Sequence, residues 1–143
     1  MMDTRNIKGG SEIPSEGYCD KPYVAKLKDG DWLCLMTTGT GREGDSGQHI
    51  VATRSSDRGV SWSDLVDIEP ADGPEASWVM PLITPSGRVY AFYTYNGENL
   101  REVIADEDTY PSGKTNRVDT LGDYAFKYSD DGGSSWSDRF TIP

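Results

Sequence analysis

The sequence predicts an all-β fold made of two copies of a four-stranded antiparallel unit. The first observation is a repeat: residues 55–64 read SSDRGVSWSD and residues 129–138 read SDDGGSSWSD, which agree at seven of ten positions at an offset of 74 residues. The second is composition, because 8 Tyr, 4 Trp and 3 Phe supply large ring surfaces to bury, and 16 Gly supply turns in a chain of 143 residues. The third is the order of apolar runs and turn residues, which is the same before each copy of the repeat.

The first unit contains four apolar runs that are expected to form strands, at 23–27, 32–36, 49–54 and 65–68. The turn Lys-Asp-Gly joins the first two runs, a glycine-rich loop at 39–47 joins the second and third, and the repeated motif leads into the fourth.

The second unit follows the same order, with apolar runs at 78–83, 89–95, 123–128 and 139–142. Its loop between the second and third strands, at 96–122, has 27 residues and is long enough to carry function. The spacing of Leu100, Val103 and Ile104 allows a helical turn within that loop. The second strand of each unit is apolar on both faces, which predicts that a neighbouring sheet covers each face.

The repeated motif has the pattern Ser-x-Asp-x-Gly-x-x-Trp, filled by Ser55, Asp57, Gly59 and Trp62 in one copy and by Ser129, Asp131, Gly133 and Trp136 in the other. These residue types predict a structural turn. The short Asp side chain accepts backbone N–H groups, Gly supplies a positive φ, and Trp fills the gap against the adjacent strands. The pattern resembles the Asp-box of sialidases and related β-propellers.

This resemblance, together with antiparallel units that have two faces to bury, implies a β-propeller of the sialidase type. Residues 1–143 would form one partial propeller domain, with blade one at about 18–70 and blade two at about 75–143. The resemblance implies six blades in the complete assembly, and two blades cannot close a ring. The chain is therefore expected to be a piece of a longer protein, or else one subunit of a homo-oligomer in which three copies complete the propeller.

The charge balance excludes two classes of partner. There are 14 Lys and Arg against 24 Asp and Glu, a formal net charge of −10, with no basic run to bind phosphates or anionic lipids. Nucleic-acid binding is not expected. No stretch approaches the roughly 20 apolar residues that span a bilayer, and the start lacks the apolar core of a secretion signal. The sequence does not indicate a compartment.

The cysteine and histidine counts argue against a disulfide and a metal site. A hairpin turn centred on Asp29-Gly30 would pair Cys34 with Ala25 and leave Cys19 about 20 Å away along the ladder. Both cysteines are therefore expected to be free, core or near-core thiols. The only histidine is His49, so neither a zinc site nor any cofactor is predicted.

Topology predicts where a binding site would lie. In an antiparallel unit of this order, the start of the first strand, the loop after the second strand and the end of the fourth strand share one end, opposite the repeated motif. The segments 18–22, 39–49, 69–78 and 96–123 therefore converge. They hold Asp20, Lys21, Arg42, Glu43, His49, Glu75, Trp78, Arg101, Tyr110, Arg117, Asp119 and Asp123.

The sialidase resemblance implies roles for several of these residues. Sialidases use a Tyr nucleophile with a Glu partner, an Asp acid, and arginines that bind the sugar carboxylate. The catalytic candidates here are Asp20, Glu75, Asp123 and His49. The substrate-binding candidates are Lys21, Arg42, Trp78, Arg117 and Asp119. Each also has a structural alternative: solvated loop charge for the acids, a strand-end position for His49, and packing between blades for Trp78.

The sequence departs from the family at one point. Sialidases typically open their first blade with Arg-Ile-Pro, whose Arg grips the substrate carboxylate, whereas this chain has Asp20-Lys21-Pro22. Lys21 supplies a charge but cannot form the bidentate fork of arginine. The expected function is a sialidase-like, exo-acting glycoside hydrolase with a glycan substrate. The alternative is a noncatalytic carbohydrate-binding or scaffold propeller.

Overall fold

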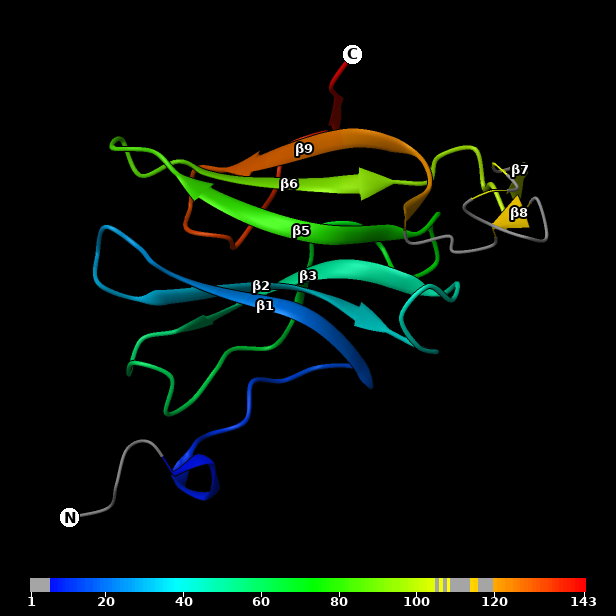
Figure 1. The fold of residues 1–143 in the computed structure, drawn as a ribbon. Coiled ribbons are helices and arrows are strands. Elements are labelled where there is room, and N and C mark those ends of the chain that lie inside the picture. The colour runs from blue at the N-terminus through cyan, green and yellow to red at the C-terminus, as the bar shows by residue number, and fades with distance from the viewer. Residues whose placement is uncertain (1–5, 105, 107, 109–113, 116–119) are drawn as a thin grey trace.

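The structure, a computed structural model, describes residues 6–104, 106, 108, 114–115 and 120–143 (Figure 1). Its elements in these ranges are a 3-10 turn, η1 (Ile7–Gly9), and strands β1 (Tyr18–Lys26), β2 (Trp32–Gly39), β3 (Gln48–Ser55), β4 (Val66–Asp67), β5 (Ala76–Ile83), β6 (Val89–Tyr95), β7 (Val103–Ile104), β8 (Lys114–Thr115), β9 (Asp123–Ser129) and β10 (Phe140–Thr141). The chain is therefore all-β, as predicted.

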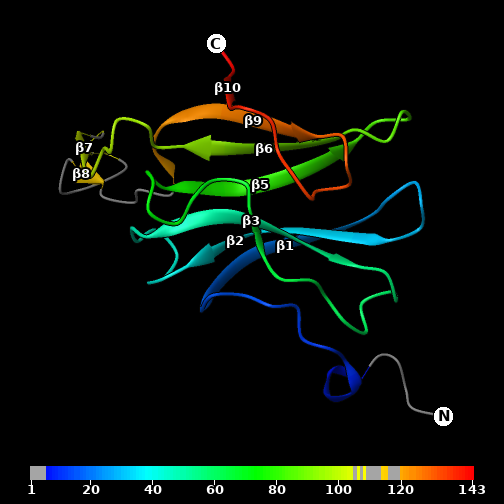
Figure 2. The ribbon, with the colours of Figure 1, turned by 180° about the vertical axis from the view of Figure 1, so that it is seen from behind.

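The strands form two four-stranded antiparallel sheets that lie face to face and do not close into a barrel (Figures 1 and 2). Sheet 1 has the order β1-β2-β3-β4, and sheet 2 has the order β10-β9-β6-β5. These orders confirm the two predicted antiparallel units. The short pair β7 and β8 stands apart from both sheets, and Val103 and Ile104 form β7 rather than the helical turn that their spacing allowed.

The main core lies between the two sheets. Period-two alternation sends Leu33 and Leu35 of β2 toward sheet 2, while Ala91 and Tyr93 of β6 face sheet 1. Small residues such as Ala125 let the sheets approach closely. Leu35 is fully buried, so truncation to Ala would cost about 2–5 kcal/mol.

The outer faces of the two sheets differ. On sheet 1, Cys34, Met36 and Val51 are fully buried beneath Ile13, Trp62 and Leu65. On sheet 2, the rings of Tyr90, Phe92, Phe126, Tyr128 and Phe140 pack against one another in stacked and tilted pairs, with centroids 5.0–6.1 Å apart. We call these five residues the aromatic ladder. Residues 89–95 alternate between buried and half-buried, so among the described residues a sheet covers only the inner face of this strand.

The first hairpin has a different register from the predicted one. Cys34 pairs with Val24 rather than Ala25, because Gly30, at φ 99°, adds a residue to the turn and shifts the ladder by one position. Both cysteines are free, as predicted. Cys34 is buried, but Cys19 is exposed and donates a weak hydrogen bond to the Met36 sulfur, 3.5 Å away, so only Cys34 is a core thiol.

The two copies of the repeated motif fold as the same turn. In the first copy, the Ser55 hydroxyl donates to Asp57 (2.8 Å) and accepts the Gly59 N–H (2.7 Å). In the second, Ser129 donates to Asp131 (2.7 Å) and accepts the Gly133 N–H (2.8 Å). Both glycines have positive φ, at 85° and 92°. The predicted structural role of the motif is therefore confirmed in its hydrogen bonds.

The tryptophans of the two turns also take equivalent places. Trp62 packs on the outer face of sheet 1, and Trp136 packs on the core between the sheets. The outer face of sheet 1 and the inner face of sheet 2 correspond to each other in the two repeated units, so each Trp covers the equivalent face of its own sheet.

No helix among the described residues is long and apolar enough to cross a membrane. In the same part of the chain, no group of three or more His, Cys, Asp or Glu side chains is arranged to hold a metal ion.

Candidate functional site

The loops predicted to converge do meet at one end of the molecule, on the right in Figure 1. Glu75 joins them: its carboxylate accepts the Gly47 N–H (3.2 Å) and a hydrogen bond from Arg101 (2.7 Å). Its backbone carbonyl accepts the Asn96 N–H (2.9 Å). The 40–47 loop of sheet 1 is thereby tied to the start of the 96–122 loop of sheet 2.

The first strand of each sheet is distorted at this end. The β1–β2 register shifts between Asp20 and Tyr23, and the β5–β6 register shifts between Ser77 and Met80. Each bulge holds one non-glycine residue with positive φ, Lys21 at 47° and Trp78 at 63°. Such conformations cost of order 1–3 kcal/mol and are concentrated at functional sites. The same strain at matching places in both sheets marks this end as the candidate site.

The two strained residues contact each other. The Lys21 ammonium lies 3.6 Å from the centroid of the Trp78 ring and 2.8 Å from the Asp20 carboxylate. The backbone N–H of Trp78 donates to the Thr37 hydroxyl of β2 (3.0 Å), which fixes the bulge of sheet 2 against sheet 1. Asp20, Lys21 and Trp78, predicted separately from the sequence, therefore form one cluster.

This cluster borders a groove of about 520 Å³. Aromatic and apolar side chains dominate its lining, and polar groups are few. The lining residues are Lys21, Tyr23, Trp78, Met80, Phe92, Tyr93, Thr94, Thr120 and Tyr124. A mainly apolar groove with a few fixed polar groups is typical of small-molecule sites.

Ser77 adds a polar group beside the groove. It pairs with the groove residue Thr94 across β5 and β6, and the Thr94 hydroxyl donates to its carbonyl (3.2 Å). The Ser77 hydroxyl is buried and has no hydrogen-bond partner among the described residues. It is a spare donor and acceptor next to the groove.

The other predicted acids are placed differently. Glu75 is buried; burial raises its pKa, but the hydrogen bonds from Arg101 and Gly47 outweigh this effect and lower the pKa overall. Glu75 is therefore an ionised structural link between loops. Asp123 is exposed at the start of β9, and neither it nor Arg42 lines the groove.

His49 lies away from the groove, on the outer face of sheet 1. It is 1% exposed, and its Nε2 is 3.4 Å from a Glu16 carboxylate oxygen and 3.5 Å from one of Asp67. It lies between the segment before β1 and β4, and neither ring nitrogen has a hydrogen-bond partner among the described residues. Two further candidates, Arg117 and Asp119, and also Tyr110, lie outside the described residues.

The sequence did not point to a buried charged cluster around Glu69. This carboxylate, 2% exposed, accepts the Tyr93 hydroxyl (2.5 Å) and Arg139 (3.0 Å), and lies 3.3 Å from the Lys127 ammonium. Burial and the bond to Glu69 raise the pKa of Tyr93, so the phenol stays protonated. The sequence carried no signal for this cluster, because residues 89–95 are apolar on both faces and do not show which tyrosine hydroxyl is buried.

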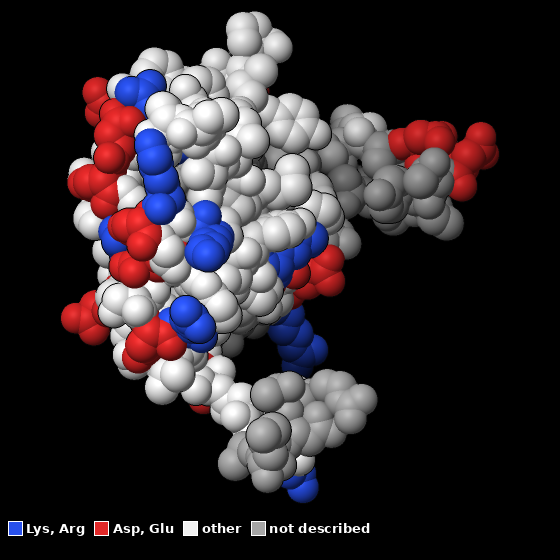
Figure 3. Space-filling view, turned by 90° about the vertical axis from the view of Figure 1, so that its left-hand side faces the viewer, with Lys and Arg blue, Asp and Glu red and all other residues white. Residues whose placement is uncertain are grey.

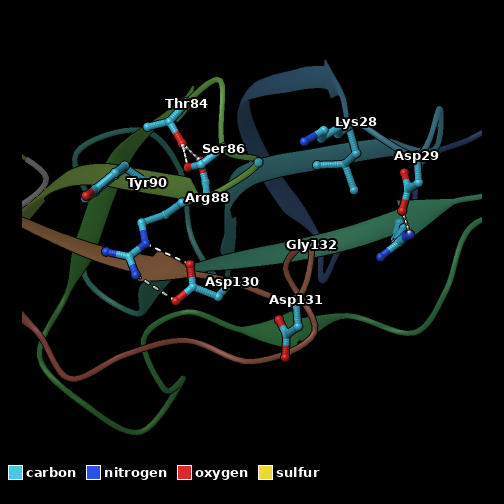
Figure 4. A pocket seen from close by; sticks show the side chains of 12 residues that line it. Lys28, Asp29, Thr84, Ser86, Arg88, Tyr90, Asp130, Asp131 and Gly132 are labelled. Atoms are coloured by element: carbon cyan, nitrogen blue, oxygen red, sulfur yellow. Dashed lines mark hydrogen bonds and ion pairs between the residues drawn. The ribbon is translucent and has the colours of Figure 1, made fainter.

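A larger cleft, of about 840 Å³, lies at the opposite end between the tight turns of the two sheets (Figure 4). Its carboxylates are already engaged: Arg88 forms a fork with Asp130 (2.7 and 2.8 Å), and Arg54 pairs with Asp29 and Asp31. Basic and acidic side chains interleave at this end rather than gathering by sign (Figure 3). These paired charges serve to hold the turns together.

Comparisons with known proteins bear on the fold of this chain and not on its function. No family model and no curated protein matches the chain. Among solved structures, it is similar to a protein of unknown function from Dyadobacter fermentans DSM 18053, with a TM-score of 0.59 and 15% sequence identity. The match covers 90% of this chain and 38% of that one, so the chain spans little more than a third of that protein's length. At this identity the likeness extends to the all-β fold and not to function.

Proposed function

We propose that this chain binds a glycan in the groove beside Trp78, as part of a β-propeller of the sialidase type. The observation that carries the proposal is the Lys21–Trp78 pair, held on two strained bulges at the edge of an aromatic groove. Sugars present apolar C–H faces that stack on aromatic rings, and hydroxyls that need a few fixed polar partners. The groove offers both kinds of contact.

The propeller part of the proposal is supported by the two sheets and their equivalent turns. Each sheet has the strand order expected of a blade, and each turn has the hydrogen bonds expected of the Asp-box pattern. The aromatic ladder of sheet 2, apart from its groove residue Phe92, is where a neighbouring blade would pack, supplied by further sequence or by another copy.

Glycoside hydrolysis is a second candidate, favoured by Asp20. Its carboxylate is ion-paired with a residue that lines the groove, which places a carboxylate beside a bound sugar. Two carboxyl groups flanking a bond are the usual requirement. Glu75 is the other acid at this end, but it is buried and bound by Arg101, so the geometry supports binding better than hydrolysis.

The proposal is tested by titrating the chain with neutral and acidic oligosaccharides and measuring binding by calorimetry. We expect saturable binding that Trp78→Ala weakens by about tenfold or more, because stacking is lost. Val60→Ala, an exposed position on the opposite end, is the matched control and should leave affinity unchanged. Equal affinity of Trp78→Ala and the wild type, with both folded by circular dichroism, would contradict the proposal.

The same samples separate the two candidate functions. Incubation with each oligosaccharide, followed by a reducing-sugar assay, detects turnover. Binding without turnover supports the carbohydrate-binding function. Turnover that is lost in Asp20→Asn would identify the chain as a hydrolase instead.

A further inference from the structure

We infer that the groove selects uncharged sugar rings over rings that carry a carboxylate, and that Asp20 is the residue that sets this preference. The inference rests on the proposed glycan binding and adds the chemical class of the ligand. It starts from the one charged side chain among the described residues of the groove, Lys21.

The positive charge of Lys21 is already balanced by the carboxylate of Asp20. Its ammonium is 2.8 Å from the Asp20 carboxylate, and both side chains are partly shielded, with exposed fractions of 33% and 25%. A ligand carboxylate that approached Lys21 would meet Asp20 at the same time, so attraction and repulsion largely cancel. Displacing Asp20 would leave its charge unpaired in a partly desolvated place.

The ammonium is also fixed in position. It lies 3.6 Å above the Trp78 ring, so it cannot swing freely toward a new anion without losing that contact. An ammonium has three N–H donors, and Asp20 uses one of them in this geometry. The remaining donors suit the hydroxyl oxygens of a neutral sugar.

The charge of the whole chain acts in the same direction. At a formal net charge of −10, the chain repels anionic ligands at long range. Arg101, at this end, is bound to Glu75 and Asn99. Arg42 does not line the groove, so the described lining of the groove holds no guanidinium to bind a sugar carboxylate.

The test compares matched neutral and acidic glycans by calorimetry. The pairs are galactose and galacturonate tetramers, mannose and mannuronate tetramers, and lactose with its sialylated form. For the wild type we expect the neutral member of at least one pair to bind about tenfold or more tightly than the acidic member. In Asp20→Asn, which frees Lys21, the ratio should shrink by about tenfold or invert, and acidic binding should weaken with added salt.

Glu98→Gln is the matched control, because it removes one charge from an exposed loop position at the same end without touching Lys21. It should keep the wild-type ratio. Tighter binding of acidic members by the wild type, or an unchanged ratio in folded Asp20→Asn, would overturn the inference while glycan binding still stands. Absence of binding to every glycan would overturn both.

Discussion

At the scale of single residues, the repeated turns owe their shape to one carboxylate each. Asp57 accepts the Ser61 N–H (2.8 Å) and its hydroxyl (2.6 Å), and Asp131 accepts the same pair from Ser135 (2.9 and 2.5 Å). These hydrogen bonds lower the pKa of each Asp to about 2. Hydrogen bonds within the turn, and not a neighbouring positive charge, thus favour the ionised form of each Asp.

We expect the free energy of unfolding to fall as the pH drops from about 4 toward 2. The folded pKa values of Asp57 and Asp131, each about 2, lie below the roughly 3.9 of an unfolded Asp. A group of this kind stabilises the folded state above its unfolded pKa, and the contribution is lost as the pH falls through the folded pKa. Urea denaturation at a series of pH values measures this slope.

A double variant, Asp57→Ala with Asp131→Ala, should be less stable at pH 7 and should lose less stability across the acid range than the wild type. Asp138→Ala, an exposed position in the second turn, serves as the control and should keep the wild-type slope. An equally steep acid slope in the double variant would show that these two carboxyls do not carry the effect.

Some residues at the candidate site could be selected from the sequence, and others could not. Asp20, Lys21 and Trp78 were selected because the topology places them at one end, and the structure brings them into contact. The cluster around Glu69 was missed, because its partners come from β6, β9 and the residue before β10 and are far apart in the sequence. Side-chain pairing over such separations depends on the packing of two sheets, which no local pattern specifies.

At the scale of elements, the strands were predictable and their irregularities were not. Apolar runs and turn residues located every strand of the two sheets. The bulges at Lys21 and Trp78 carried no signal, because neither residue type favours a positive φ. The one-residue error at Cys34 had a related cause, since Gly30 made the first turn one residue longer than a two-residue loop.

A close backbone approach at the start of β9 gives a prediction at this scale. Gly122 has φ 105°, and a Cβ there would lie 2.1 Å from the Tyr95 carbonyl oxygen. Gly122→Ala should therefore destabilise the protein by at least about 2 kcal/mol, through both the strained φ and the clash. Gly30→Ala has a similar φ of 99° but meets nothing within 4 Å, so it should cost only about 1 kcal/mol.

Thermal unfolding of the two glycine variants separates the cost of the strained φ from the cost of the clash with Tyr95. The difference between them isolates the close approach of Tyr95, because both lose the freedom of glycine. If Gly122→Ala were no less stable than Gly30→Ala, the tight junction between the 96–122 loop and β9 would not exist in solution.

At the scale of the whole molecule, the two outer faces predict different behaviour. The outer face of sheet 1 is covered by Ile13, Trp62 and Leu65, whereas no layer of the described residues covers the aromatic ladder of sheet 2. Phe140 of the ladder is 45% exposed, and Leu82 of β5 is 53% exposed. An apolar face of this kind drives association, since burial removes it from water.

We therefore expect the isolated chain to self-associate through sheet 2, with a mass by light scattering that exceeds 15.8 kDa and rises with concentration. A double variant, Leu82→Glu with Phe140→Glu, should lower the mass toward that of one chain, because two charges cannot be buried without partners. Val60→Glu, 71% exposed and far from this face, should leave the association unchanged. A closed ring of three copies would also need the outer face of sheet 1, so a stable trimer would mean that Ile13 and its segment move aside. A single-chain mass at every concentration would show that the ladder is not an association surface.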